Sequence, residues 1–307
     1  MTQANKETRE TRCPVCAGRD LLVEKPYPNQ KKRFLQVTNL AHCKACGLFF
    51  AYPMPTKTEL DNYYSAGVYY RDKQPDNPEF KAFSYAIAES RLELIARFVD
   101  QKASLRLLDI GAGNAILGKV ILKKKPNISY DIVEPSPEIA DLRDSGVRTA
   151  YQWITDIRKQ EYDIVTLNQV LEHVNHPLDF IKSIQAHLKK GGLLYVDVPN
   201  RDDRFKEAVE PHVLFWDSTS IRYTLERAGF NILFLSSAGM TIARAGNYFA
   251  MGTSLTQRLL SPDRWTSRFN AIFNRLKLPF QFRHPAVRQS RVYGADRQWL
   301  RCVAQYA

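Results

Sequence analysis

The sequence predicts an α/β fold in which a mostly parallel, seven-stranded sheet has helices on both faces, preceded by a small cysteine-rich module. Three observations predict this arrangement. Short apolar segments alternate with helical ones between residues 105 and 235, which is the pattern of a parallel sheet with covered faces. A glycine-rich turn follows the first of these strands, and four of the five cysteines form two C-x-x-C pairs near the N-terminus.

Composition narrows the class of protein. The 307 residues suffice for one α/β domain and a small extra module, and 44% of them are hydrophobic, which excludes a disordered chain. No apolar run approaches the about 18 residues of a membrane-spanning helix. The polar N-terminus lacks the apolar segment of a signal peptide, so we expect a cytoplasmic protein with a disordered tail over residues 1–10.

The net charge of +12 is unevenly spread along the chain. Residues 241–307 hold 11 basic and 2 acidic side chains, whereas the middle of the chain is slightly acidic. A basic surface suggests an anionic partner, such as nucleic acid, a phosphorylated substrate or acidic lipid. Solubility alone is the simpler explanation of such charge.

Residues 11–55 are predicted to form a zinc-ribbon module. Its four thiols belong to Cys13, Cys16, Cys43 and Cys46. Without a secretory signal, paired cysteines favour a metal over disulfides. Each pair can place two thiolates on one ion, and two pairs complete the tetrahedral site of a structural zinc. A redox-active C-x-x-C is the alternative, but the glycines just beyond each pair are more typical of a metal site. We expect that His42, beside Cys43, is not a metal ligand.

The remaining elements follow in order. Residues 56–103 are predicted as a linker and cap helices, including a helix over Glu79–Val99, and residues 104–240 as the α/β core. Within the core, strands are predicted over 105–110, 130–133, 147–151, 162–167, 193–198 and 232–235. Helices are predicted over 115–124, 137–145, 178–188 and 218–228, with Gly191 and Gly192 ending the third. Residues 241–307 are predicted as a basic helical insertion and a final strand over 299–303.

The turn after the first core strand has the composition of a ligand-binding turn. Gly111 permits a tight turn, Gly113 allows close approach of a ligand, and the following helix offers free N–H groups. Glu134 ends the next strand 21 residues after Gly113, where a carboxylate can accept both hydroxyls of a ribose. The fingerprint of dinucleotide-binding proteins, G-x-G-x-x-G, has a third glycine at the position of Ile116. Because that glycine is missing here, the turn favours an adenosine ligand that carries no phosphate.

These residues resemble a known family. Leu107–Asn114 resembles motif I of class I methyltransferases, and four further segments resemble their later motifs in the same order: 131–136, 162–174, 191–199 and 225–230. The resemblance covers roughly residues 105–235. It implies a Rossmann-like methyltransferase domain, methyltransferase activity and S-adenosylmethionine as cofactor.

The resemblance also implies roles for individual residues. The implied cofactor-binding residues are Asp109, Gly111, Ala112, Gly113, Asn114, Glu134, Pro135, Gln152, Trp153, Asn168 and Gln169. Among them, Asp109 and the two glycines would line the amino-acid end and ribose of the cofactor. Gln152 and Trp153 would contact adenine, and Asn168 and Gln169 would face the region of methyl transfer.

The candidate catalytic residues follow the fourth and fifth core strands. A base assists methyl transfer when the acceptor bears a proton, and His173, with Glu172 beside it, is the first candidate. His212 is the second, because related methyltransferases often carry a histidine there. Purely structural roles are the alternative for all three. Ubiquinone-pathway O-methyltransferases associate a similar Glu-x-x-Glu-His segment with a divalent metal, but here Gln169 occupies its first position.

An amphipathic helix is predicted to begin at Ser261-Pro262-Asp263, with Arg264 and Arg268 beside its apolar face. Such a helix can lie on anionic lipid or clamp a phosphorylated acceptor. Burial of its apolar face on the domain is the more common arrangement.

Three functions are compatible with these features. The first is S-adenosylmethionine-dependent methylation of a small anionic acceptor, such as a sugar nucleotide or glycolipid, because zinc ribbons before such domains resemble those of sugar C-methyltransferases. The second is an RNA methyltransferase that grips phosphates with the ribbon and basic C-terminal region. The third is a non-enzymatic protein that has kept the fold.

Overall fold

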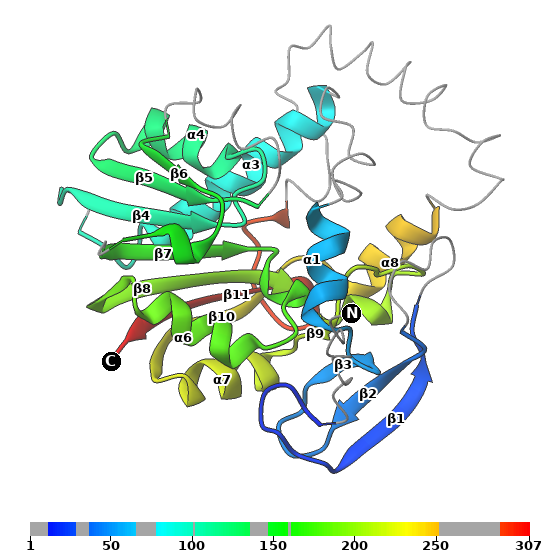
Figure 1. The fold of residues 1–307 in the computed structure, drawn as a ribbon. Coiled ribbons are helices and arrows are strands. Elements are labelled where there is room, and N and C mark those ends of the chain that lie inside the picture. Colours follow the sequence, from blue (N-terminus) through cyan, green and yellow to red (C-terminus); the bar gives the residue numbers. More distant parts are fainter. Residues whose placement is uncertain are drawn as a thin grey trace, which may run out of the picture.

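The computed structural model describes residues 12–28, 37–65, 78–100, 102–135, 147–158, 161–251 and 289–307, whose strands form two sheets (Figure 1). The helix predicted over 137–145 and the basic helix predicted from Ser261 lie outside these residues. No described helix is long and apolar enough to cross a membrane.

The larger sheet has seven strands in the order β10-β11-β8-β7-β4-β5-β6. They are β4 (Leu105–Ile110), β5 (Ile128–Val133), β6 (Thr149–Tyr151), β7 (Tyr162–Asn168), β8 (Leu188–Pro199), β10 (Phe230–Thr241) and β11 (Arg297–Tyr306). Strands β4 to β8 pair in parallel, and only β11 runs against its neighbours. The predicted mostly parallel, seven-stranded sheet is therefore confirmed. The strand order reverses beside β4, and in open α/β sheets the carboxyl ends of the strands at such a point are the usual place for a ligand.

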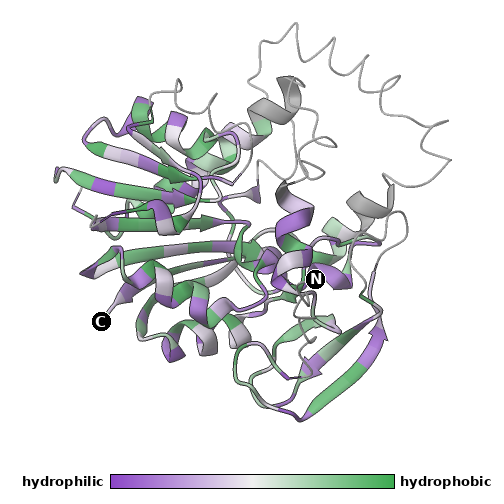
Figure 2. Ribbon diagram, in the orientation of Figure 1, coloured by the Kyte–Doolittle hydropathy of each residue, from purple (hydrophilic) through white to green (hydrophobic). Residues whose placement is uncertain are grey.

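Helices cover both faces of this sheet (Figure 1). One face packs against α3 (Pro78–Ile95) and α4 (Ile116–Lys124), and the other against α6 (Pro177–Gln185) and α7 (Ser218–Arg227). Successive strand residues alternate between the two cores: Leu107 belongs to the α3–α4 core and Leu108 to the α6–α7 core. Both faces are buried, so the central strands read as hydrophobic runs (Figure 2).

The smaller sheet is antiparallel, with the order β1-β2-β3-β9. Its strands are β1 (Leu21–Pro26), β2 (Asn39–Cys43), β3 (Phe49–Tyr52) and β9 (Leu214–Phe215). The first three come from the N-terminal module, but β9 follows the fifth strand of the core and pairs with β3 through Phe49↔Phe215 and Phe50↔Leu214. Buried side chains of the module and of the α6–α7 face therefore form one continuous core.

The remaining described elements connect these sheets. They are α1 (Lys57–Ser65), α8 (Ile242–Met251) and three short 3₁₀ helices: η1 (Ile154–Asp156), η2 (Leu171–His173) and η3 (Asp202–Arg204). The helix predicted over Glu79–Val99 is α3, which ends at Ile95 and continues as turns.

The predicted boundary between the third core helix and the fifth core strand is wrong. The helix predicted over 178–188 ends at Gln185, and β8 already begins at Leu188, so Gly191 and Gly192 lie within a strand. The pairing with β7 explains this, because Leu188 pairs with Tyr162 and Leu193 with Ile164, and the residues between bulge outward. Gly191 has φ +74°, a conformation that favours glycine in such a bulge.

Candidate active site

The glycine-rich turn joins the carboxyl end of β4 to the start of α4. Its N–H groups are partly engaged: that of Gly111 donates to the Val133 carbonyl at 2.7 Å, and that of Gly113 to Glu134 Oε2 at 2.6 Å. Gly113 has φ +52°, and a Cβ added there would meet nothing within 4 Å. The turn is thus left-handed and open at Gly113. The Glu134 carboxylate lies against it, although 21 residues separate the two.

Asp109, near the end of β4, is held by both neighbouring strands. Its buried carboxylate accepts hydrogen bonds from Tyr130 Oη at 2.7 Å, Thr166 Oγ1 at 2.6 Å and Asn168 Nδ2 at 3.1 Å. Burial raises the pKa of Asp109, and the three hydrogen bonds oppose this shift. The sequence singled out Asp109 and Asn168 but not Tyr130 or Thr166, which lie inside the strands β5 and β7 and had no role assigned to them.

The other predicted cofactor residues lie along the same edge of the sheet. Ala112 and Asn114 complete the turn, Pro135 follows Glu134, and Gln152 and Trp153 follow β6 with exposed side chains. These residues follow the carboxyl ends of β4, β5 and β6. The buried Oδ1 of Asn168 has no hydrogen-bond partner among the described residues, so it could accept one from a ligand.

Gln169 is turned toward β8. Its Nε2 donates to Asp197 Oδ1 at 2.9 Å, and Gln169 itself has φ +58°. Asp197 also accepts hydrogen bonds from Arg91 at 2.9 Å and from Arg301 at 3.0 Å. Burial opposes ionisation of Asp197, but the two guanidinium groups outweigh it and lower its pKa. Sequence reasoning missed this network because its members come from α3, β8 and β11.

The three candidate catalytic residues come together, although His212 is far from the other two in sequence. His173 Nε2 lies 3.8 Å from Glu172 Oε1, and the His173 and His212 rings meet edge to face with centroids 4.8 Å apart. Glu172 is 1% exposed, and neither carboxylate oxygen has a hydrogen-bond partner among the described residues. Burial raises the pKa of Glu172 well above its usual value.

Two groups that the sequence did not single out contact His212. Asp202 Oδ2 lies 2.9 Å from His212 Nδ1, and Lys206 Nζ lies 2.8 Å from the same oxygen. Tyr27, from the N-terminal module, donates its hydroxyl to the His212 carbonyl at 2.7 Å. Asp202 begins the short helix η3 and Tyr27 follows β1, both without a recognisable motif, so only the folded arrangement identifies them.

The cluster of Glu172, His173 and His212 is compact enough to be considered for a metal. Ligand atoms of Glu172, His173 and His212 lie within 4.8 Å of one another. The first residue of the metal-associated segment is Gln169, however, and its amide is committed to Asp197. We therefore assign no metal to this cluster.

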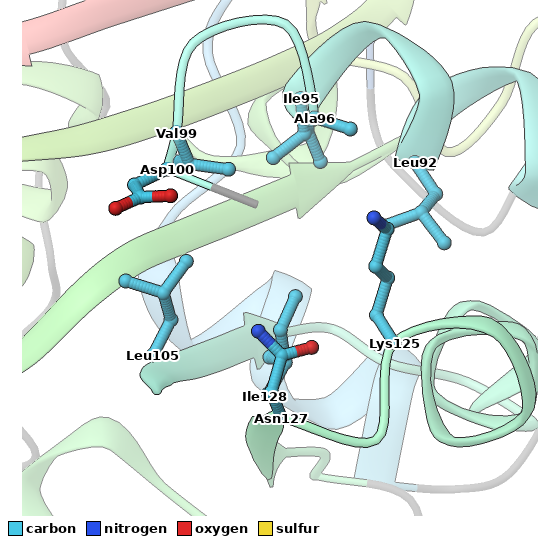
Figure 3. Close-up of a pocket in the computed structure, with 9 residues that line it drawn as sticks. All are labelled: Leu92, Ile95, Ala96, Val99, Asp100, Leu105, Lys125, Asn127 and Ile128. Carbon is cyan, nitrogen blue, oxygen red and sulfur yellow. The ribbon is translucent and has the colours of Figure 1, made fainter. Parts of the chain in front are cut away.

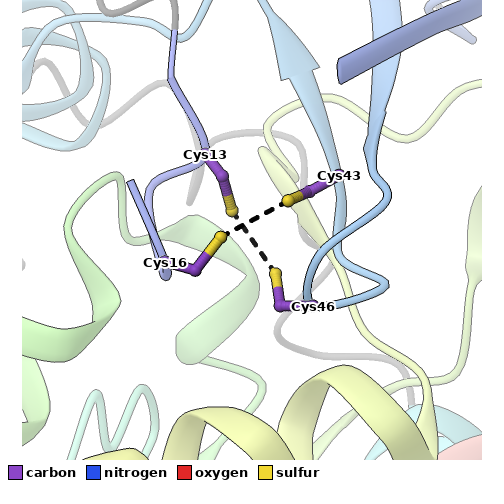
Figure 4. Close-up of side chains that lie close together, drawn as sticks. All are labelled: Cys13, Cys16, Cys43 and Cys46. Carbon is purple, nitrogen blue, oxygen red and sulfur yellow. Dashed lines mark hydrogen bonds between the residues drawn. The ribbon is translucent and has the colours of Figure 1, made fainter. Parts of the chain in front are cut away.

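The four cysteine side chains of the N-terminal module converge (Figure 4). The Sγ atoms of Cys13 and Cys46 are 3.5 Å apart, and those of Cys16 and Cys43 are 3.4 Å apart. These separations exceed the about 2.05 Å of a disulfide. They approach the about 3.8 Å between thiolates around a tetrahedral zinc with bonds of about 2.3 Å. The cluster is thus compatible with structural zinc.

The two cysteine turns are built differently. Gly47, after the second pair, has φ +76°, as expected for a turn that needs glycine. After the first pair, Ala17 has φ +57°, and Gly18 instead donates its N–H to Cys16 Sγ at 3.4 Å. A Cβ on Gly18 would lie 3.0 Å from that sulfur, so the glycine provides room beside the thiol. His42 stacks on Phe49, away from the thiol set.

A separate small pocket lies at the amino ends of β4 and β5 in the large sheet (Figure 3). It is lined by the end of α3 and by Leu105 and Ile128, the first residues of β4 and β5. The glycine turn and histidine cluster lie at the opposite, carboxyl ends of the strands. This pocket is therefore distinct from the candidate site.

Solved structures with similar chain paths have low sequence identity. Plantazolicin methyltransferase BamL matches with a TM-score of 0.49 and 11% identity, covering 81% of this chain and 94% of that one. An S-adenosylmethionine-dependent methyltransferase from Thermotoga maritima matches with a TM-score of 0.48 and 16% identity, covering 81% and 98%.

Sequence relatives include ubiquinone biosynthesis O-methyltransferases. That of Bordetella avium is 30% identical over 156 residues, which cover 48% of this chain and 63% of the relative. That of Histophilus somni is 30% identical over 137 residues, which cover 41% and 57%. The chain therefore matches less than two thirds of the length of these relatives.

A family model described as a methyltransferase domain matches residues 82–235, which is half of the chain. The matched region begins in α3 and ends in β10, and it contains the glycine turn, Glu134 and the Glu172–His173 pair. The chain belongs to this methyltransferase domain family.

Proposed function

We propose that the chain transfers a methyl group from S-adenosylmethionine to a small anionic acceptor, such as a sugar nucleotide or glycolipid. One observation carries the proposal: an open glycine turn beside Glu134 and a cluster of two histidines follow strands that end at the same edge of one sheet. When bound, the cofactor supplies an electrophilic methyl group, so the protein must orient two reactants and manage a proton.

The first part of the proposal concerns cofactor binding. Glu134 would exchange its hydrogen bond from Gly113 for the two ribose hydroxyls. The Asn168 Oδ1 offers a further acceptor, while Asp109 holds the Asn168 amide in place. Gln152 and Trp153, which follow β6 with exposed side chains, would contact the adenine.

The second part concerns the acceptor. Either His173 or His212 would take the proton that a hydroxyl, amine or acidic carbon releases as it is methylated. The net charge of +12 favours an anionic acceptor. The four-cysteine module supports a sugar-derived acceptor by its resemblance to sugar C-methyltransferases, and we propose that it holds one zinc ion.

Calorimetric titration of the zinc-loaded protein with S-adenosylmethionine and S-adenosylhomocysteine tests the cofactor site. We expect Glu134→Ala to weaken binding by roughly 10- to 100-fold, because a hydrogen bond to a charged group contributes about 1.5–3 kcal/mol. Glu161→Ala is the matched control, since Glu161 is an exposed carboxylate at the start of β7. Failure of the unaltered protein to bind either compound would contradict the proposal. Binding would direct acceptor screens to sugar nucleotides before RNA.

A further inference from the structure

We infer that Asp202 is a positioning residue that orients the His212 imidazole to receive the proton of the acceptor. The inference rests on the proposed methyl transfer and chooses between its two histidines. It also brings in a residue without any family motif. Asp202 belongs to the short helix η3, between β8 and β9, ten residues before His212.

Asp202 has the properties of a fixed anion. Its side chain is 1% exposed, and Oδ2 lies 2.9 Å from His212 Nδ1 and 2.8 Å from Lys206 Nζ. Its backbone carbonyl accepts hydrogen bonds from the N–H groups of Phe205 at 3.1 Å and Lys206 at 2.8 Å, and these bonds fix the backbone of Asp202. Burial opposes ionisation, but His212 and Lys206 outweigh it and keep the pKa of Asp202 below its usual value.

The backbone of His212 is also fixed. Its N–H donates to the Val209 carbonyl at 2.9 Å, and its own carbonyl accepts the Tyr27 hydroxyl at 2.7 Å. The next residue, Val213, donates its N–H to the Glu172 carbonyl at 2.7 Å. The ring therefore faces the Asp202 carboxylate at 2.9 Å, a contact that lacks regular hydrogen-bond geometry, while the backbone of His212 is held from two sides.

This arrangement selects a tautomer. A carboxylate at Nδ1 favours the imidazole with its proton on Nδ1, which leaves the Nε2 lone pair free to accept a proton. The proton passes from the acceptor atom to Nε2, and the electron pair of the broken bond stays on the acceptor for methylation. The resulting imidazolium is stabilised by ionised Asp202, as in other base–carboxylate pairs.

His173 contacts different groups. Its Nε2 lies 3.8 Å from Glu172, whose burial favours the neutral acid, and its Nδ1 lies 3.4 Å from the Pro211 carbonyl. A neutral acid stabilises an imidazolium less than an ionised carboxylate does. His212 is thus the better-supported base, with His173 packed against its ring.

The test compares Asp202→Asn with Asp203→Asn. Asp203 is also buried, but it binds Lys25 and Arg201 instead of a histidine. Long-range ¹H–¹⁵N NMR reports which nitrogen of His212 carries the proton, and turnover and cofactor affinity are measured on the same samples. We expect Asp202→Asn to lose the Nδ1–H tautomer and to lower kcat by about 10²- to 10⁴-fold. Cofactor affinity should stay within about twofold, whereas Asp203→Asn should keep the tautomer.

The unaltered protein provides a test that does not depend on a variant folding. A His212 tautomer with its proton on Nε2 would overturn the inference, as would equal losses of kcat in the two variants. Selective broadening of the His173 and His212 signals by Mn²⁺ would assign the cluster to a metal instead. Loss of the proposed function is distinguishable, because an unaltered protein that binds no cofactor would still report its histidine tautomer.

Discussion

Glu172 carries a carboxyl group that is 1% exposed and accepts no hydrogen bond from any described residue. Burial disfavours its charged form and raises its pKa well above the ordinary value of about 4.3. The folded chain therefore holds the proton more tightly than the unfolded chain. This contribution to stability is fully present below about pH 4.3 and is lost as pH rises through the folded pKa.

Replacement of Glu172 by Gln removes this pH dependence, because the amide is neutral throughout. We expect Glu172→Gln to gain stability relative to the unaltered protein as pH rises from 5 to 8, by about 1.4 kcal/mol for each pH unit of that interval that lies below the folded pKa. Urea denaturation at both pH values measures the difference. Glu161→Gln, at an exposed position, should show no such trend. An equal effect of Glu172→Gln at both pH values would disprove the assignment.

Residues that belong to a local motif could be identified from the sequence, and those that depend on distant contacts could not. Gly113 and Glu134 follow strands, so their meeting at one edge is a consequence of parallel pairing. Asp202 becomes significant only because its loop returns beside His212. Tyr27 is more remote still, since its partner lies 185 residues away.

At the scale of elements, α4 approaches β5 closely because Gly118 has no side chain. A Cβ at Gly118 would overlap the buried ring of Tyr130, whose hydroxyl donates to Asp109 at 2.7 Å. The third glycine of the dinucleotide fingerprint, which allows helix and strand to pack closely, is replaced here by Ile116. Gly118 provides such close packing two residues later.

We therefore expect Gly118→Ala to destabilise the fold by about 1–3 kcal/mol through overpacking, despite the higher helix propensity of alanine. Displacement of Tyr130 should also weaken cofactor binding through Asp109. Thermal unfolding and calorimetric titration measure the two effects. Gly246→Ala in α8 is the control, because its Cβ would make an ordinary 3.5 Å contact with Phe205. A fully stable Gly118→Ala protein would contradict the packing argument.

Element boundaries could be predicted where local sequence determines them. β4 was predicted over 105–110 and spans those residues, since an apolar run ends at a glycine turn. β10 and β11 were predicted too short, because each is extended by pairing with the other from Phe230↔Tyr306 to Thr241↔Arg297. Such pairing depends on a partner that is 56 to 76 residues away, which a local pattern does not report.

At the scale of the whole molecule, strand pairing and hydrogen bonds connect the cysteine module to the histidine cluster. β2 ends at Cys43 and pairs with β3, which pairs in turn with β9, two residues beyond His212. Val213 connects the two regions directly, because its carbonyl accepts the Ala51 N–H at 2.8 Å and its N–H donates to the Glu172 carbonyl at 2.7 Å. The segment that carries His212 is thus supported by the N-terminal module.

This connection predicts that loss of the metal affects the histidine cluster but not the glycine turn that would bind the cofactor. We expect one zinc ion per chain, and its removal with a chelator should abolish methyl transfer by releasing the β3–β9 pairing and His212. Cofactor affinity should change little, because Gly113 and Glu134 are bound to each other on β4 and β5, away from the module. Metal analysis, turnover and calorimetric titration of the same samples measure this split.

Cysteine variants separate the metal site from general effects of thiol loss. Cys43→Ser should reproduce the metal-free behaviour, whereas Cys302→Ser should not, since Cys302 is buried in β11 outside the four-cysteine cluster. Restored zinc should recover turnover in the chelated protein but not in Cys43→Ser. Full turnover without metal would show that β9 holds His212 independently of the module. Loss of cofactor binding together with turnover would mean that the module stabilises the whole chain rather than the histidine cluster alone.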